Sequence, residues 1–368
     1  MLFQTPSITE REAEVNDEID AIRRQLNLPR LREWPGLPWR AIHDRILQAS
    51  KNPALGNSFF ENASAAEEPG SENPDAWLAA PGYHAALSFV LQLAEAPDFA
   101  IDEGTIRALH YMMAGHDPRS AAGRWRRGSI SVREDSSGKA MYRAPHAKFI
   151  PALMAELIAS LNAKDEVPVF IRAAMAHLNL AAIHPFRDAN GRMARALQTF
   201  VLARDGISAP PFASIDEYLS VNTGEYYRIL DEVDEGAWQP ERDARPWVRF
   251  CLTAHWLQAR TLLRRTEEYD RLWDELEREV KHRDLAERTI FALAEAAIGG
   301  SLAAALHQST AGVSAREAGD DLERLVEAGL LVATSDKGGR CYLAADALKA
   351  IRARTLDPQI PERDPFAA

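Results

Sequence analysis

A short stretch of this 368-residue chain gathers six residues whose types suit phosphate chemistry. The stretch reads HPFRDANGRMAR, and the six are His184, Asp188, Asn190, Gly191, Arg192 and Arg195. Apolar helical spacing on both sides predicts two helices joined by a short loop, which brings the six residues to one helix N-terminus. Backbone N–H groups and the helix dipole favour an anion there. The arginines add bidentate donors for phosphate oxygens, and Gly191 lets the backbone approach closely.

Two of these residue types extend the chemistry beyond binding. An acidic residue beside a phosphate site is repulsive unless it holds a cation, so Asp188 is a candidate ligand for Mg²⁺ that also binds the phosphates. A histidine has an ordinary pKa of about 6.5, so His184 is largely neutral at pH 7 and can take a hydroxyl proton. Alone, a histidine before proline at a helix end is usually a core residue. The combination favours a site that activates a hydroxyl beside bound phosphates.

The stretch resembles the signature of the Fic family, His-x-Phe-x-Asp/Glu-Gly/Ala-Asn-Gly-Arg-x-x-Arg, and matches it at every defining position. A hairpin predicted at residues 129–142 lies where the family has a flap that aligns the target segment. Residues 225–230, EYYRIL, are similar to the helix behind the family's adenine pocket. The likeness covers roughly residues 50–260.

The resemblance implies a protein adenylyltransferase, which transfers AMP from ATP to a Ser, Thr or Tyr hydroxyl of a target protein. His184 would deprotonate that hydroxyl, and Asp188 would bind Mg²⁺ bridging the α- and β-phosphates. Arg195 would meet the γ-phosphate. The anion hole would be formed by Asn190, Gly191 and Arg192. This assignment agrees with the general dependence of phosphoryl chemistry on positioning and charge neutralisation.

Three aromatic residues receive structural or binding roles from the same resemblance. Phe186 would anchor the loop in the core rather than touch substrate. Tyr226 and Tyr227 would line the nucleotide pocket, although ordinary core aromatics are the competing interpretation. Asp234 stands where some family members have an adenine-contacting Asn, which leaves that contact open.

Residues 57–62, NSFFEN, are similar to the family's inhibitory motif, Ser/Thr-x-x-x-Glu-Gly/Asn. Asn57 replaces the usual Ser or Thr, and Asn caps helices about as well as Ser. The resemblance implies that Glu61 pairs with Arg195 and blocks productive placement of the γ-phosphate. A surface glutamate after two buried phenylalanines is the competing interpretation.

Helical periodicity in the rest of the chain predicts the elements that position the loop. Helices are expected at residues 10–26, 39–50, 84–94, 102–114, 150–162, 168–180 and 247–281. Residues 63–74 are small, acidic and turn-forming, which predicts a surface loop. Four arginines cluster at and before the hairpin: Arg124, Arg126, Arg127 and Arg133. They could steer ATP or an acidic target, or form a solvated face.

The C-terminal part has the outline of a winged helix. Helical patterns at 284–297, 301–308 and 314–328 precede two short strands around 337–339. The third helix holds two arginines against five carboxylates and would repel DNA phosphates. It is therefore interpreted as a protein-contact or dimerisation element. The alternative function is a DNA-binding regulator whose Fic core senses nucleotide, and removal of AMP is a second alternative.

The composition excludes several other classes. A net charge of −11 argues against nucleic-acid binding as the main activity, because an acidic chain can bind nucleic acid only through a local basic patch. Cys251 and Cys341 are too few for a zinc site and suggest no disulfide framework. Neither a signal peptide nor an apolar run of about 18 residues is visible, so we expect a cytoplasmic protein without a membrane span.

These patterns predict a mainly α fold with a Fic helical core, a β-hairpin flap and a C-terminal winged helix. The expected parts are an N-terminal helical region with the inhibitory helix at 1–75, a catalytic core at 76–265, a linker helix and winged helix at 266–350, and a tail at 351–368. The charged helix at 260–281 could pack on the winged helix or on a second chain, so a homodimer stays open. The target protein also stays open.

Overall fold

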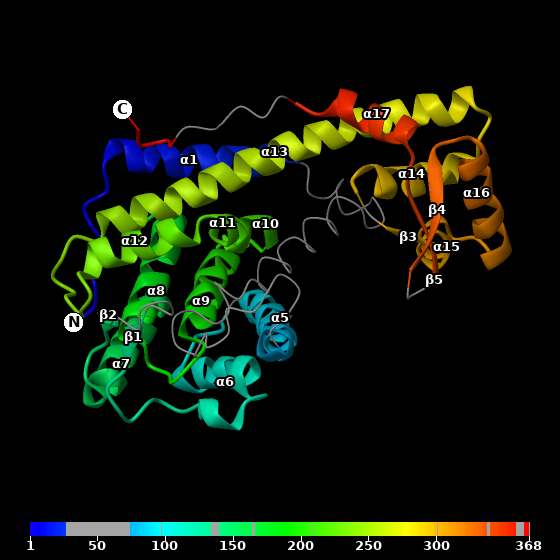
Figure 1. The fold of residues 1–368 in the computed structure, drawn as a ribbon. Coiled ribbons are helices and arrows are strands. Elements are labelled where there is room, and N and C mark those ends of the chain that lie inside the picture. Colours follow the sequence, from blue (N-terminus) through cyan, green and yellow to red (C-terminus); the bar gives the residue numbers. More distant parts are fainter. Residues whose placement is uncertain are drawn as a thin grey trace. The chain divides into compact units, whose positions relative to one another are not determined.

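The protein is mainly helical in a computed structural model (Figure 1). The structure describes residues 1–26, 74–96, 98–133, 140–163, 166–208, 210–299, 301–336, 339–357 and 364–367. These residues divide into two compact units. The first contains 1–23, the described residues from 74 to 259, and 364–367, while the second contains 24–26 and 260–357. Across these ranges, no helix has the length and apolar character needed to cross a membrane.

The first unit is centred on helices α8 (Val169–Ile183) and α9 (Asn190–Arg204), which pack along each other. Nearly every residue of both helices is buried, as expected for helices that are covered on all sides. Helices α5 (Pro74–Ala94), α6 (Glu103–Ala114) and α7 (Ile150–Asn162) pack around them. The loop between α8 and α9 holds the motif, so its geometry depends on the most buried part of the unit.

Helix α5 begins ten residues before the predicted helix at 84–94. Its first residue is Pro74, and proline is tolerated in the first turn because its missing N–H has no helical acceptor there. Gly82 lets α6 approach closely, since a Cβ built on it would collide with the carbonyl oxygen of Met112. The predicted helix at 39–50, most of the predicted loop at 63–74, and the inhibitory residues 57–62 lie outside the described residues.

The predicted hairpin is confirmed. Strands β1 (Ser131–Arg133) and β2 (Ala140–Arg143) pair antiparallel. The end of β2 is fixed to the segment after α12 (Thr223–Asp234), because the Arg143 N–H donates to Gly236 O at 2.8 Å and Trp238 N–H donates to Arg143 O at 3.2 Å. The hairpin is therefore attached at its base to the body of the first unit.

The remaining elements of the first unit are short except for its terminal helices. They are α1 (Glu10–Gln25), the 3₁₀ helices η1 (Pro118–Ser120) and η2 (Ala147–Phe149), α10 (Pro210–Ala213), α11 (Asp216–Val221) and the first part of α13 (Arg245–His282). Buried Glu12 fixes α1 to α13 through Arg245 and Arg249, whose Nε atoms lie 3.1 and 2.9 Å from its Oε1. Thus α1 packs with the unit that holds the motif.

The second unit contains the helices and hairpin predicted from the C-terminal pattern. They are η3 (Glu287–Thr289), α14 (Ile290–Ala297), α15 (Ala304–Ala311), α16 (Ala315–Glu327), β4 (Leu331–Asp336) and β5 (Gly339–Ala344). Strand β3 (Leu302–Ala303) and helix α17 (Asp346–Thr355) were not predicted. The antiparallel sheet has the order β3-β5-β4 and packs on a leucine-rich core that includes Leu293, Leu322 and Leu325.

Candidate active site

Left-handed backbone residues stand at both ends of the loop that carries the motif. His184, which follows α8, has φ +52°, and Ala189, which precedes α9, has φ +58°. Residues other than glycine rarely adopt this conformation, and such strain gathers at functional sites. The His184 N–H donates to Leu180 O at 3.0 Å and closes the end of α8. The chain therefore turns sharply at both ends, which confines the site to a few residues.

The interior of the loop is fixed by Asn190 and Phe186. The Asn190 side chain accepts from Phe186 N at 3.0 Å and donates to Phe186 O at 3.1 Å. Phe186 is fully buried, as predicted. Its ring stacks on His110 at 3.7 Å and lies 4.8 Å from the Trp125 ring. Both polar atoms of the Asn190 side chain are thus used by the Phe186 backbone. Any contact of Asn190 with a bound anion would therefore be made by its backbone N–H.

His110 positions the loop and was not predicted from the sequence. Its Nε2 lies 3.1 Å from Asp188 O, while Gly123 N–H donates to its Nδ1 at 2.8 Å. The ring therefore donates from Nε2 to the loop carbonyl. Burial lowers the pKa of His110 to about 4, which keeps the ring neutral and this arrangement intact at pH 7. A single histidine on the buried face of a helix gives no sequence signal of such a role.

His184 has the protonation state that a general base needs. Its Nδ1 lies 3.0 Å from Ala181 O, so the neutral ring donates from Nδ1 and carries its lone pair on Nε2. Burial, aided by the nearby Arg126 cation, lowers the pKa of His184 to about 4. The imidazole is therefore neutral at pH 7 and able to accept a proton at Nε2.

The N-terminus of α9 provides the candidate anion site. Its N-cap, Ala189, makes no side-chain cap bond, and the first N–H groups of any helix lack intrahelical acceptors. Arg192 adds a buried guanidinium, whose Nη2 lies 3.2 Å from Asp188 Oδ2 and whose Nη1 donates to Met113 O at 3.3 Å. Donors and positive charge converge at this end, so the geometry suits a phosphate.

Arg195 forms a buried ion pair with Asp216, a residue that the sequence did not single out. Arg195 Nε lies 2.5 Å from Asp216 Oδ1, and the two side chains are 4% and 0% exposed. The other carboxylate oxygen, Oδ2, accepts from Tyr83 OH at 3.0 Å and Ser214 Oγ at 2.7 Å. The carboxylate raises the pKa of Arg195 despite its burial, which keeps the guanidinium charged. Asp216 thereby fixes the position of the last motif arginine.

Tyr226 lies in the aromatic core, and its part in a nucleotide pocket stays a prediction. It is 5% exposed, packs against Trp247 and Phe250, and its hydroxyl lies 3.2 Å from His177 Nε2. A ring enclosed by other rings offers almost no surface to a ligand. Tyr227 is half-buried beside it, with ring centroids 4.9 Å apart, and its part in a nucleotide pocket stays a prediction.

Asp234 has an unusual ionisation for a carboxyl group. Burial raises its pKa to about 7, against the hydrogen bond that it accepts from Gly236 N at 2.8 Å. The folded protein thus favours the protonated form of Asp234. The free energy of unfolding therefore falls as pH rises from about 4 to about 7, and this group changes it no further above that range. Asp234→Asn is expected to raise the free energy of unfolding at pH 8 by up to about 4 kcal/mol, with little change at pH 4.

Thermal unfolding of the full chain at pH 4, 6 and 8 measures this effect. Asp98→Asn is the matched control, because it removes an exposed carboxyl group and should shift the melting temperature little at any pH. An Asp234→Asn stabilisation that is equal at all three pH values would contradict the buried, protonated carboxyl group.

Comparisons with known proteins show what this chain is similar to. Residues 100–202 match the family model described as Fic/DOC family. The chain is 32% identical over 175 residues to "Protein adenylyltransferase fic-1" of Caenorhabditis briggsae, which covers 46% of this chain and 30% of the relative. It is 32% identical over 173 residues to "Protein adenylyltransferase Fic" of Aedes aegypti, with the same shares covered. The chain thus spans about a third of the length of the curated relatives it matches.

Two solved structures share the fold. A Fic family protein from Desulfovibrio desulfuricans matches with a TM-score of 0.56 at 21% identity, covering 93% of this chain and 98% of that one. Fic-1 from C. elegans matches with a TM-score of 0.50 at 20% identity, covering 68% of this chain and 70% of that one. The mainly helical Fic fold is therefore confirmed.

Proposed function

We propose that this chain, whose residues 100–202 are a Fic/DOC family domain, is a protein adenylyltransferase that uses ATP. The observation that carries the proposal is the arrangement at the α8–α9 loop. A neutral His184, with its lone pair on Nε2, lies beside a helix N-terminus to which Arg192 adds positive charge. The names of the curated relatives support the same activity.

The residues of this chain would divide the reaction between binding and proton transfer. The N–H groups at the start of α9, with Arg192 and Arg195, would hold the phosphates and offset their charge. His184 Nε2 would take the proton of a target hydroxyl as its oxygen bonds to the α-phosphorus. The bond from the α-phosphorus to the bridging oxygen would break, so pyrophosphate leaves and AMP stays on the target.

Asp188 fits the part of a Mg²⁺ ligand. Its carboxylate is 13% exposed and lies at the anion end of α9, where one oxygen pairs with Arg192. Mg²⁺ commonly takes one or two protein carboxylates and completes its shell with substrate phosphates and water. Bound there with ATP, the ion would neutralise phosphate charge.

Labelled ATP tests the proposed reaction directly. The purified chain is incubated with a cell protein extract, Mg²⁺ and ATP that carries label at either the α- or the γ-phosphate. We expect covalent protein label from the α-position alone, and only when the chain is present. Label from the γ-position would make the protein a kinase and contradict the proposal.

We further infer that Glu61 restrains this activity, on the strength of the inhibitory motif at 57–62. Glu61→Gly is expected to raise self-labelling by α-labelled ATP, because it would remove the carboxylate that is inferred to block productive placement of the γ-phosphate. The measurement is the initial rate of label incorporation by the purified protein. Glu67→Gly is the matched control, since it removes a nearby glutamate outside the motif. Equal rates for wild type and Glu61→Gly would refute the restraint.

The second unit is proposed as a winged helix that contacts protein rather than DNA. Helix α16 carries an excess of carboxylates; one of them, Asp321, is buried and pairs with Arg288 at 2.7 Å. The acidic excess would oppose DNA phosphates. Such a contact could be made with a second copy of this chain. Cys251 and Cys341 are free thiols, which supports the proposed cytoplasmic location.

A further inference from the structure

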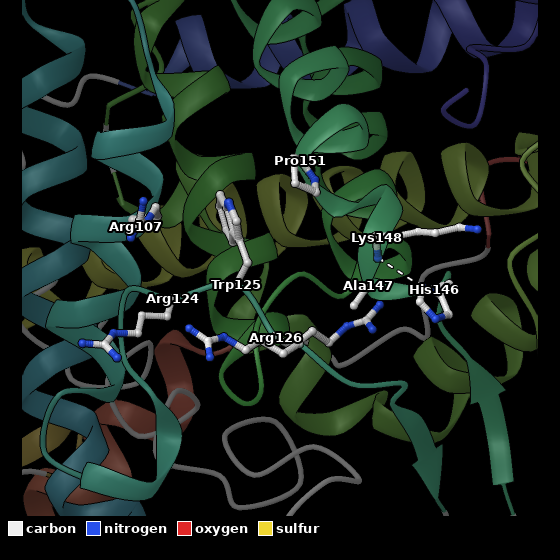
Figure 2. Close-up of a pocket in the computed structure, with 9 residues that line it drawn as sticks. Arg107, Arg124, Trp125, Arg126, His146, Ala147, Lys148 and Pro151 are labelled. Atoms are coloured by element: carbon white, nitrogen blue, oxygen red, sulfur yellow. Dashed lines mark hydrogen bonds between the residues drawn. The ribbon is translucent and has the colours of Figure 1, made fainter.

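A basic pocket lies beside the catalytic loop in the first unit. It has a volume of about 620 Å³, within the range of ligand-binding pockets. It is lined by Arg107, Arg124, Trp125, Arg126, Arg127, His146, Ala147, Lys148 and Pro151. Figure 2 shows the basic side chains coming from three segments: Arg107 from α6, Arg124 and Arg126 from the loop before β1, and His146 and Lys148 from the segment after β2. In a chain of net charge −11, this is a local concentration of positive charge.

Most of this charge has no acidic partner among the residues that the structure describes. Arg107 Nη1 lies 3.2 Å from Glu103 Oε1, which also accepts from Trp125 Nε1 at 3.2 Å. Among the described residues, no carboxylate forms an ion pair with Arg124, Arg126, Arg127 or Lys148. Arg124 and Arg127 are exposed, so their guanidinium groups can adjust to a ligand.

Arg126 makes the positive potential a fixed feature of the pocket. It is 8% exposed, and it donates to four backbone carbonyl oxygens at 2.6–3.3 Å, which belong to Gly128, Pro145, Ile183 and His184. These neutral acceptors position the guanidinium without cancelling its charge. A buried cation without a counter-charge is costly, and a bound anion would offset that cost.

The same contacts join the pocket to the catalytic loop and the hairpin. Arg126 N donates to Pro185 O at 2.9 Å, and its Nε donates to His184 O at 2.6 Å. Two of the segments that line the pocket adjoin the hairpin in sequence, since Arg127 precedes β1 and His146 follows β2. Neither Arg192 nor Arg195 lines the pocket, so it is separate from the candidate phosphate site at α9.

We propose that this pocket binds an acidic segment of the protein substrate, rich in Asp or Glu, near the hydroxyl that is modified. This inference rests on the proposed transfer to a protein hydroxyl. Carboxylates supply the missing counter-charges, and the position beside the hairpin allows one polypeptide segment to reach both the pocket and His184. The pocket would thereby select targets by charge while the loop performs the chemistry.

The test compares two double variants of the full chain. Arg124→Gln/Arg127→Gln removes the two exposed charges of the pocket, and Arg278→Gln/Arg316→Gln removes two exposed charges in the second unit. The probe is a fluorescein-labelled hexaglutamate peptide, and binding is measured by anisotropy at low salt. We expect binding to wild type and to the second-unit variant, about tenfold weaker binding to the pocket variant, and none of a hexaglutamine peptide.

ATP affinity separates this inference from the proposed function. ATP should bind all three proteins equally and should not displace the hexaglutamate peptide, because the pocket is distinct from the phosphate site. Equal peptide affinity for wild type and the pocket variant would overturn the inference, as would displacement by ATP. Either result would leave the labelled-ATP test unaffected. Conversely, peptide binding with no AMP transfer would refute the function and leave only an acidic-segment site.

Discussion

His184→Asn is expected to lower the rate of AMP transfer by roughly 10²–10⁴-fold while ATP affinity stays unchanged. The loss follows from the role of Nε2, which carries the lone pair because Nδ1 lies 3.0 Å from Ala181 O. An asparagine amide cannot take up a proton, so the target hydroxyl would have to attack without a base. Transfer rates with α-labelled ATP and ATP affinity by calorimetry, measured on the same preparation, check both parts.

Asparagine is the informative replacement because His184 has φ +52°. Asparagine tolerates the left-handed conformation better than alanine does, so the loop should keep its shape. His116→Asn is the matched control: it removes an exposed histidine and should leave the rate unchanged. Full transfer by His184→Asn would show that another group serves as the base.

Asp216→Asn is expected to destabilise the fold by about 3–5 kcal/mol, because it removes a buried charge that pairs with the buried Arg195 cation. The affinity for ATP should also fall, since Arg195 would lose the contact that sets its position. Denaturant unfolding of the full chain measures the first effect and calorimetry the second. Tyr83→Phe is a milder comparison: it removes one hydrogen bond to Asp216 and should cost about 1 kcal/mol.

A double-mutant cycle separates the ion pair from general damage to the core. Arg195→Met combined with Asp216→Asn removes both charges, so it should be more stable than Asp216→Asn alone. Additive losses in the double variant would mean that the two groups do not stabilise each other. That outcome would contradict the role of Asp216 as the residue that positions Arg195.

The central part of the site could be predicted because its residues are close in sequence. Helical spacing on both sides of the motif places His184, Asp188 and Arg192 at one helix end without long-range information. The residues that hold the loop are distant. His110 lies 78 positions from the Asp188 carbonyl that it contacts, and Arg126 lies 58 positions from His184. Neither contact has a local pattern, so only the packing of α6 and the segment before the hairpin reveals it.

Asp216 and Tyr226 show how burial changes the interpretation of a residue. An acidic residue at the start of a short helix ordinarily caps it in solvent, which gives no reason to expect a buried ion pair at Asp216. Tyr226 follows the family-like EYYRIL pattern, yet α12 turns it towards Trp247 and the core. The face that a residue occupies depends on neighbouring helices, and the sequence pattern alone could not decide it.

The fold was predictable wherever an element is long and periodic. Helices α7 and α13 match the expected ranges closely, and the hairpin was recognisable from alternation around a turn. The two-residue strand β3 is too short to show alternation and exists only because β5 pairs with it. The early start of α5 was missed because Pro81 suggests a helix boundary, whereas the helix continues through it.

The most direct test of the central claim is the intact mass of the protein after incubation with Mg²⁺ and ATP. The two proteins compared are Glu61→Gly and Glu61→Gly/His184→Asn. The proposed chemistry predicts a mass increase equal to one or more AMP groups on the first protein and no increase on the second. An increase equal to a phosphoryl group, or an AMP adduct that persists without His184, would contradict AMP transfer with His184 as its base.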